Sequence, residues 1–300
     1  MITGIHFLLT YTCTYECDHC FLYCGPHSEG TFTGEQLAGV FEEISRMPEV
    51  DSVYFEGGEA FLFYPLLLEG VRMARDLDLK VGIVTNGYWA TSEKDAELWL
   101  KPLAEMGIAD ISISDDVFHH GGADESPAQK GIRAARKLGL PVGSICIEEA
   151  RVEAGGVKGE PVIGGGVRLR GRAAEKLADG LPTRNWKRFV SCPDEDFENP
   201  GRVHIDSFGN VHLCQGLIMG NMWSDPLSKL VQDYDPKAHP IVGPLMEGGP
   251  ARLAEAYHVK IEEEYISECH MCYLVRKALV ERFPRYLAPR QVYGLDDEQT

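Results

Sequence analysis

The sequence predicts an α/β fold in which parallel strands curl into a partial barrel, with a smaller domain after it. Short apolar strands alternate with amphipathic helices at the spacing of βαβ units. Residues suited to binding sites follow successive strands, at the edge where barrels of this kind carry their sites. After about residue 185, the elements become shorter and Pro, Gly, Asp and Cys interrupt them.

The alternation is most regular in the first half of the chain. Strands are expected at residues 5–10, 52–55, 80–85, 109–115, 141–147 and 162–170. Helices are expected at residues 35–47, 63–77, 93–106 and 126–138. Thr33 suits the N-cap of the first helix, and Gly107 and Gly139 follow the ends of two others. Because right-handed crossovers place the helices outside, these elements predict a partial (β/α)6 TIM-like barrel.

The second half predicts a smaller domain. The stretch HIDSFGNVHLC, residues 204–214, is typical of a hairpin, with Gly209-Asn210 at its turn. Helices are expected at 226–234 and 273–283, and the acidic end at 295–300 is expected to fray. We therefore expect a barrel at 1–184, a cysteine-containing domain at 185–285 and a C-terminal tail at 286–300.

Composition argues against two classes of partner. The formal net charge is −17, which repels phosphate backbones and disfavours nucleic acid. Arg168, Arg170 and Arg172 form the one suggestive basic cluster. No apolar run is long enough to span a bilayer, and the first ten residues lack the basic start of a signal peptide. We expect a cytoplasmic protein with no membrane partner.

Nine cysteines in a chain of this kind indicate metal or redox chemistry, because disulfides are rare in the cytosol. Cys13, Cys17 and Cys20 form a CxxxCxxC motif directly after the first strand. Three thiolates in one loop can hold three corners of a [4Fe–4S] cube and leave the fourth iron open to a small molecule. The spacing alone also fits a zinc site or a chance grouping.

With His19 as its aromatic-type residue, this motif resembles the CxxxCxΦC motif of radical SAM enzymes. The resemblance implies that the open iron binds S-adenosylmethionine (SAM) through its amino and carboxylate groups. One electron, supplied by a reductant such as flavodoxin or ferredoxin, would cleave a C–S bond and release a 5′-deoxyadenosyl radical. That radical would abstract hydrogen from the substrate, which makes Cys13, Cys17 and Cys20 the catalytic cluster ligands.

Further motifs fall at the next strand ends in chain order. Gly57-Gly58-Glu59 resembles the GGE motif that contacts the SAM amino group, although Ala60 stands where proline is usual. Thr85-Asn86-Gly87 resembles the TNG turn, and SISDD at 112–116 would present alternate residues to the barrel interior. The resemblance thus implies these SAM-binding residues: His19, Gly57, Gly58, Glu59, Thr85, Asn86, Ser112, Ser114, Asp116 and Arg170.

Four later cysteines, Cys192, Cys214, Cys269 and Cys272, predict a second metal site. Their thiolates suit either zinc or an iron–sulfur cluster. The order of Gly171-Arg172-Ala173, Cys192-Pro193, the hairpin and CHMC resembles the SPASM/twitch extension of radical SAM enzymes. Four cysteines suit the twitch form, which implies one auxiliary [4Fe–4S] cluster. The alternative is a zinc ribbon that only stabilises the end of the chain.

Other side chains have two interpretations each. Arg170 or Arg172 would bind a carboxylate of SAM or substrate, or would lie on a solvated edge. We expect Cys146 to pack in the core and Cys24 to be a structural thiol, with hydrogen-atom donation to a substrate radical as the alternative. We expect His119-His120 on a loop surface.

The resemblance implies redox or cross-linking chemistry on a peptide, as in the maturation of ribosomal peptides, or on a small molecule. A small-molecule dehydrogenase of the same family is the first alternative. A non-catalytic binding module held together by metal is the second, and SAM-dependent methyl transfer is disfavoured because a second catalytic cysteine pair is not evident. The barrel begins within a few residues of Met1, so we expect no N-terminal domain that binds a leader peptide.

Overall fold

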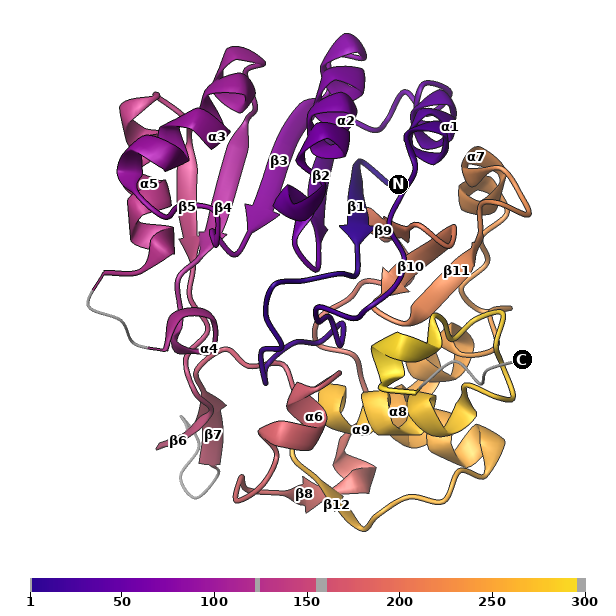
Figure 1. Ribbon diagram of the computed structural model, residues 1–300. Coiled ribbons are helices and arrows are strands. Elements are labelled where there is room, and N and C mark those ends of the chain that lie inside the picture. The colour runs from indigo at the N-terminus through magenta and orange to yellow at the C-terminus, as the bar shows by residue number, and fades with distance from the viewer. Residues whose placement is uncertain (1, 122–124, 155–160, 296–300) are drawn as a thin grey trace.

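The computed structural model describes residues 2–121, 125–154 and 161–295. Its centre is one sheet in the order β11-β10-β9-β1-β2-β3-β4-β5 (Figure 1). These strands are β1 (Gly4–Thr10), β2 (Ser52–Gly57), β3 (Lys80–Thr85), β4 (Asp110–Ser114), β5 (Val142–Ile145), β9 (Arg202–Asp206), β10 (Asn210–Cys214) and β11 (Leu217–Asn221). Within the described residues six of them, from β9 through β1 to β5, run parallel. The predicted fold class, an α/β partial barrel, is confirmed.

The sixth parallel strand comes from a different segment than the sequence predicts. The strand predicted at 162–170 extends only to Gly164, because Gly165 and Gly166 have positive φ angles of 96° and 79° and the chain leaves extended backbone there. The short β7 (Pro161–Gly164) pairs instead with β6 (Arg151–Ala154) in a separate ribbon. The barrel position beside β1 is taken by β9, with His6 opposite His204.

Four helices cover one face of the sheet (Figure 1). They are α1 (Gly34–Ile44), α2 (Tyr64–Asp76), α3 (Glu93–Glu105) and α5 (Pro127–Lys137). The predicted N-cap is confirmed, because the Thr33 side chain accepts from the backbone N–H of Gln36, whose side chain accepts from Thr33. Gly107 and Gly139 follow α3 and α5 with positive φ angles, as the sequence predicts.

The core lies between the sheet and these helices. Phe7 of β1 is fully buried and stacks on Phe41 of α1 and Phe55 of β2, at ring-centroid distances of 5.2 and 5.1 Å. Because side chains alternate along a strand, His6 and Leu8 point to the opposite face. That inner face carries the candidate site.

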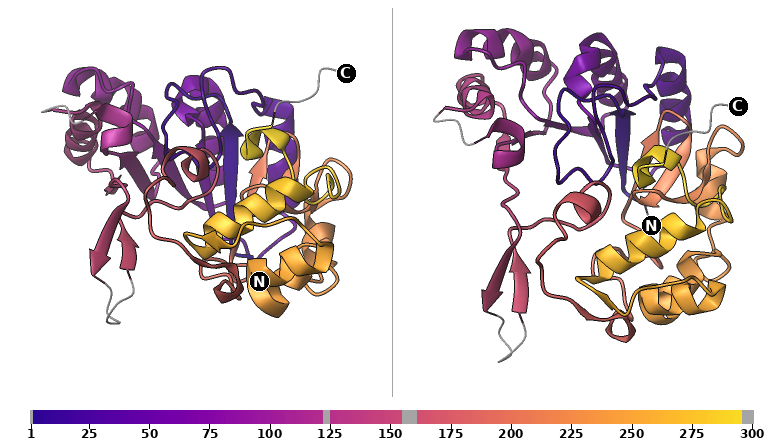
Figure 2. Two further views of the ribbon diagram at one scale, coloured as in Figure 1. Left: turned by 90° about the horizontal axis from the view of Figure 1, so that it is seen from below. Right: turned by 60° about the horizontal axis from the view of Figure 1, so that its bottom comes forward.

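The C-terminal part packs below the carboxyl ends of the barrel strands (Figures 1 and 2). Its elements there are α6 (Ala173–Lys176), β8 (Arg184–Asn185), η2 (Trp186–Arg188), α8 (Val242–Tyr257), β12 (Glu264–Tyr265), α9 (Glu268–Leu279) and η3 (Arg290–Tyr293), where η marks a 3₁₀ turn. Helix α7 (Leu227–Gln232) lies apart from them and packs against α1. The first half of the chain has two further short elements, η1 (Ala60–Phe63) and α4 (Val117–His120). The hairpin β9–β10 belongs to the same sheet as β1. The boundary at 184/185 stays a prediction, and residues 296–300 of the expected frayed end lie outside the described residues.

Helix α8 is absent from the sequence prediction. Gly248 and Gly249 interrupt it with non-helical backbone, and Pro250 follows, so its apolar periodicity breaks in the middle. The Gly249 backbone lies against the segment from Phe189 to Ser191, where an added Cβ would be 2.4 Å from Ser191 N. The kink therefore lets this helix approach the chain next to Cys192.

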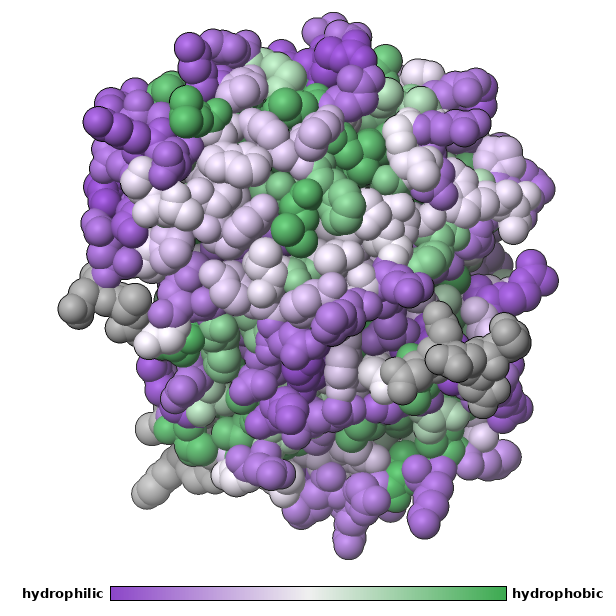
Figure 3. Space-filling model, in the orientation of Figure 1, coloured by the Kyte–Doolittle hydropathy of each residue, from purple (hydrophilic) through white to green (hydrophobic). Residues whose placement is uncertain are grey.

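Ion pairs cover the outer helices. Arg133 of α5 contacts Glu93 at 3.1 Å, and Lys137 contacts Glu97 at 2.5 Å. On the face drawn in Figure 3, hydrophilic side chains gather over α3 and α5. No helix among the described residues is long and apolar enough to cross a membrane.

Candidate active site

The cysteine loop after β1 opens into a cavity of about 440 Å³ on the inner face of the barrel. Cys13, Cys17 and Cys20 all line it. Cys13 and Cys17 are each 8% exposed, and the Cys20 N–H donates to Cys17 O at 3.0 Å. The three motif cysteines therefore meet at one site, at the strand ends where the sequence places them.

Burial and neighbours set the protonation of these thiols. Burial raises the pKa of Cys13 to about 11 and that of Cys17 to about 12. A hydrogen bond with the Cys24 thiol lowers the pKa of Cys20 to about 6. Buried thiolates need a nearby cation, which an iron–sulfur cluster would supply, so the donor set fits the group that the motif implies. Cys24 itself is 3% exposed and lies beside the loop.

Two glycines bring the end of β2 against the cysteine loop. Gly57 has a φ angle of 136°, and a Cβ on Gly58 would lie 2.2 Å from Thr12 O. The Gly58 N–H donates to Thr10 O at 2.7 Å. Both glycines thus lie against the backbone of the cysteine loop, and both also line the cavity.

The GGE and TNG motifs contact each other. The Glu59 carboxylate is 1% exposed and accepts from Thr85 Oγ1 at 2.8 Å, Asn86 N at 2.7 Å and Phe61 N at 3.0 Å. Burial raises the pKa of Glu59 to about 7. Asn86 Nδ2 donates to Thr14 Oγ1 at 3.0 Å and lies 3.6 Å from Cys13 Sγ. A contact of Glu59 with the SAM amino group stays a prediction.

The SISDD face contributes two cavity residues, Ser114 and Asp116. Ser112 donates instead to Asp110 Oδ2 at 3.1 Å. Asp116 caps α4 by accepting from the backbone N–H groups of Phe118 and His119, at 3.1 and 3.2 Å, and it accepts from His119 Nδ1 at 2.8 Å.

His119 was expected on a loop surface, and that prediction was wrong. Its side chain lies on α4, is 12% exposed and packs against His19 at a ring-centroid distance of 5.1 Å. Burial lowers the pKa of His19 to about 4, and its ring packs on Phe118 at 4.5 Å. The Asp116 N-cap orders α4, and this turn brings His119 beside the motif.

The two arginines that the sequence singles out reach different partners. Arg172 donates to Cys17 O and Cys24 O, both at 2.9 Å, and so holds the cysteine loop. Arg170 Nη1 lies 3.0 Å from Cys214 Sγ. Arg170 lines both the first cavity and a second one. Arg170 is 6% exposed, and Arg172 is half-buried through its contacts with the cysteine loop. Neither arginine therefore lies on a solvated edge.

The second cavity brings together the four later cysteines. Cys269 and Cys272 lie one turn apart in α9, Cys214 ends β10 and Cys192 precedes a proline. Cys269 Sγ donates to Asp194 Oδ2 at 2.9 Å, and burial raises the pKa of Cys272 to about 11. Cys146, expected in the core, is exposed after β5 and lines neither of the cysteine-lined cavities, so that prediction was wrong.

The sequence analysis missed several polar residues on the inner face. His6, Glu56 and His204 line the first cavity beside the motif residues. A histidine within the apolar strand sequence IHFLLT was the available signal, because it interrupts an otherwise buried run. Its partners could not be read from the chain, since they depend on the pairing of β1 with β9.

One segment of the chain matches a known protein family. Residues 7–148 match the family described as the radical SAM superfamily. This segment, a little under half of the chain, is similar to the radical SAM domain. This segment contains the cysteine loop, the two-glycine turn and the strand ends that form the first cavity.

Two curated relatives match parts of this chain. One, a putative peptide biosynthesis protein YydG of Bacillus subtilis, is 24% identical over 125 residues, which cover 42% of this chain and 39% of that protein. The other is the tungsten-containing aldehyde ferredoxin oxidoreductase cofactor-modifying protein of Pyrococcus furiosus. It is 28% identical over 110 residues, covering 37% of this chain and 30% of that protein. The chain thus spans well under half of either relative.

A solved structure shares the fold. The crystal structure of BtrN in complex with AdoMet and 2-DOIA superimposes with a TM-score of 0.51 at 18% sequence identity. The match covers 77% of this chain and 82% of that one. At this identity the likeness supports the α/β architecture alone.

Proposed function

We propose that this protein is an enzyme that cleaves SAM reductively at the Cys13/Cys17/Cys20 site and abstracts hydrogen from a substrate. The observation that supports it is the single cavity that these cysteines share with Gly57, Gly58 and the Thr85-Asn86 turn. When bound, a [4Fe–4S] cluster and SAM supply a one-electron C–S cleavage that yields a 5′-deoxyadenosyl radical.

The chain's own residues would hold and orient these groups. The three thiolates bind the cluster, and Arg172 fixes the loop that carries them. The side-chain amide of Asn86 contacts Cys13 Sγ, and the Glu59 carboxylate accepts hydrogen bonds that hold the Thr85-Asn86 turn in place. His19, Ser114 and Asp116 line the side of the cavity where we place SAM.

We further propose that Cys192, Cys214, Cys269 and Cys272 bind an auxiliary [4Fe–4S] cluster in a twitch-like domain that accepts or relays an electron. Arg170 lines both cavities and contacts Cys214, so the two sites adjoin across one side chain. The alternative is that these four thiolates bind a zinc ion, which would only stabilise this part of the fold.

We propose a peptide or a small molecule as the substrate, with oxidation or cross-linking as the reaction. The match to a putative peptide biosynthesis protein supports the peptide, and the match to a cofactor-modifying protein supports the small molecule. A flavodoxin or ferredoxin would supply the electron. Small-molecule dehydrogenation is the alternative reaction.

Iron and zinc per chain, together with 5′-deoxyadenosine formation, test this function. The protein is purified and reconstituted without oxygen as wild type, as the Cys13/Cys17/Cys20 triple alanine variant and as Cys146→Ala. About eight irons falling to about four in the triple variant, with loss of 5′-deoxyadenosine, support both clusters. Cys146→Ala is the matched control, because it removes an exposed thiol outside both cysteine-lined cavities.

Other outcomes decide between the alternatives. About four irons falling to none, with about one zinc retained, makes the second site structural and removes the electron relay. Wild type that binds iron but forms no 5′-deoxyadenosine with SAM and dithionite overturns the proposed activity and favours a binding module.

A further inference from the structure

Three polar side chains that the proposed SAM chemistry does not use meet on the inner face of the barrel. They are His6 of β1, Glu56 of β2 and His204 of β9. His6 Nδ1 is in hydrogen-bond contact with Glu56 Oε1, and His204 Nε2 lies 3.8 Å from Glu56 Oε2. One ligand atom from each residue lies within 4.8 Å of the other two. Three metal-binding side chains thus converge on one point.

The sheet register produces this convergence. His6 lies directly opposite His204 in the parallel pair β1–β9, and Glu56 lies opposite Leu8 in the pair β1–β2. Because side chains alternate in strands, all three point to the inner face. The two imidazole rings are 4.8 Å apart, and the Tyr54 ring stacks on His6 at 4.8 Å. Three rigid strands therefore hold the ligands, as a preformed site requires.

The charges of the cluster suit a cation. Burial lowers the pKa of His204 to about 3, which leaves its imidazole neutral and able to ligate. Burial alone would raise the pKa of Glu56, but the hydrogen bond from His6 keeps it below its usual value. Glu56 is therefore a carboxylate with 20% of its side chain exposed. Arg202, which also lines this cavity, is 51% exposed and pairs with Glu195 at 3.6 Å.

We propose that His6, Glu56 and His204 bind a divalent first-row transition metal such as Zn²⁺, apart from the cysteine sites. Two imidazoles and one carboxylate are a common donor set for such ions. Three protein ligands leave a coordination position open, and here it faces the cavity of about 440 Å³. A hydroxyl, carbonyl or carboxylate oxygen of the substrate would bind there, which would fix the substrate's position in the barrel.

Zinc binding to the reconstituted protein tests the site, with Zn²⁺ as the probe and iron measured in the same samples. The variants are Glu56→Gln and His204→Gln, which remove one ligand each. His258→Asn is the matched control: it removes an exposed imidazole, and asparagine tolerates the positive φ of 55° at that position. We expect wild type and His258→Asn to bind one more zinc per chain than the two site variants. We expect those variants to bind it at least about 10-fold more weakly.

Equal zinc binding by wild type and both site variants would overturn the proposal. If the variants fail to fold, shown by lost iron and lost far-UV circular dichroism, X-ray absorption at the zinc edge of wild type decides. Zinc–nitrogen or zinc–oxygen distances of about 2.0–2.1 Å support the site, and only zinc–sulfur distances of about 2.3 Å overturn it. Zinc binding is independent of SAM cleavage, so failure of the proposed function and failure of this site are separate results.

Discussion

A single guanidinium holds the cysteine loop in shape. Arg172 donates to Cys17 O and Cys24 O from two different nitrogens, and its backbone N–H donates to Cys20 O at 2.9 Å. Its planar group also packs over the Tyr23 ring at 5.1 Å. These contacts tie the loop that follows β1 to a segment more than a hundred residues later, which no local sequence rule foresees.

We expect Arg172→Lys to destabilise the protein by about 1–3 kcal/mol, because an ammonium cannot span both carbonyls and leaves one without its donor. It should also lower the iron retained per chain after gel filtration. Arg46→Lys, just after the end of α1 and with 54% of its side chain accessible, should change both by little. Equal urea midpoints and equal iron in the two variants would contradict this role for Arg172.

Position 58 must be glycine, because the surrounding backbone leaves no room for a side chain. We expect Gly58→Ala to cost more than about 3 kcal/mol, because the new Cβ would lie 2.2 Å from a backbone oxygen that cannot move without displacing the loop. Gly39→Ala in α1 is the control, since nothing lies within 4 Å of its added Cβ. That change should stabilise the protein by about 0.5–1 kcal/mol. The measurement is the unfolding midpoint of each variant, and a tolerated Gly58→Ala would refute the steric reason.

At the scale of elements, local signals predicted what local interactions decide. Thr33, Gly107 and Gly139 mark helix ends through hydrogen bonds and backbone angles within a few residues, and all three are where the sequence puts them. The sixth barrel strand was misplaced because both 162–170 and 202–206 are apolar enough for a strand. Only the pairing with β1 chooses between them, and that contact spans about two hundred residues.

His239 joins two elements and gives them a pH dependence. Its Nδ1 accepts from the backbone N–H groups of Ile241 and Val242 at the start of α8, at 3.2 and 3.1 Å. Its Nε2 donates to Ile218 O of β11 at 2.9 Å. Burial lowers the pKa of His239, and a proton on Nδ1 would abolish both cap contacts. The neutral ring is therefore the form that stabilises the fold.

Since the folded-state pKa of His239 is below its unfolded value, stability falls as pH drops through and below about 6.5. We expect a lower denaturation midpoint at pH 5.5 than at pH 7.5, with this residue contributing at most about 1.4 kcal/mol of the loss. In His239→Asn the pH-dependent loss should shrink, while His27→Asn, which changes an exposed histidine, should keep it in full. An unchanged loss in His239→Asn would show that other groups cause it.

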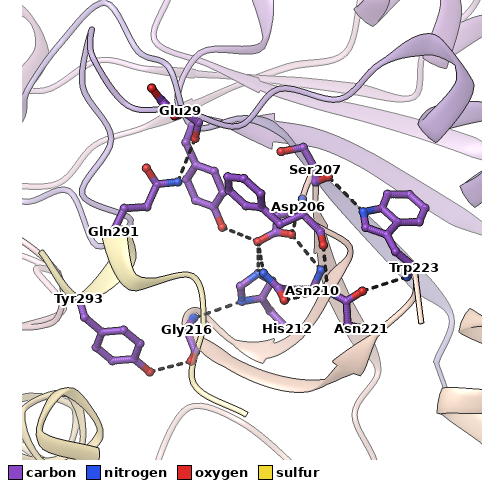
Figure 4. A network of polar contacts seen from close by, with 12 residues as sticks. Glu29, Asp206, Ser207, Asn210, His212, Gly216, Asn221, Trp223, Gln291 and Tyr293 are labelled. Atoms are coloured by element: carbon purple, nitrogen blue, oxygen red, sulfur yellow. Dashed lines mark hydrogen bonds and ion pairs between the residues drawn. The ribbon is translucent and has the colours of Figure 1, made fainter. Parts of the chain in front are cut away.

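At the scale of the whole molecule, one buried carboxylate links the N-terminal loop to the C-terminal hairpin. Asp206 is fully buried, and Oδ2 accepts from Tyr11 Oη at 3.0 Å, Asn210 Nδ2 at 2.9 Å and His212 Nε2 at 3.0 Å. Oδ1 accepts from the backbone N–H groups of Phe208 and Asn210, at 3.0 and 2.9 Å. Figure 4 shows how the network continues through His212 to Gly216.

The candidate site was predictable to the same extent as the fold. The cysteine spacings and the strand-end turns are local, so the sequence names the cysteines, glycines and turn residues of the first cavity. The partners of Arg170, Arg172 and His6 come from segments more than forty residues away, and no spacing rule supplies them. The sequence also draws a boundary at 184/185, whereas the sheet continues from β5 through β1 to β11 across it.

We therefore expect the chain to unfold as one unit, and Asp206→Asn to weaken both of its parts together. An amide has one acceptor oxygen, so its NH₂ group would face either the two backbone donors or the three side-chain donors, at a cost of about 2–4 kcal/mol. Tyr11→Phe, the milder control, removes one donor and should cost about 1 kcal/mol.

Unfolding in urea is followed by tryptophan fluorescence and by iron released from each cysteine site. In Asp206→Asn both signals should shift to lower urea by the same amount, because β9 and β1 share one sheet. A shift in the C-terminal signal alone would mean that the boundary at 184/185 separates two independently stable domains.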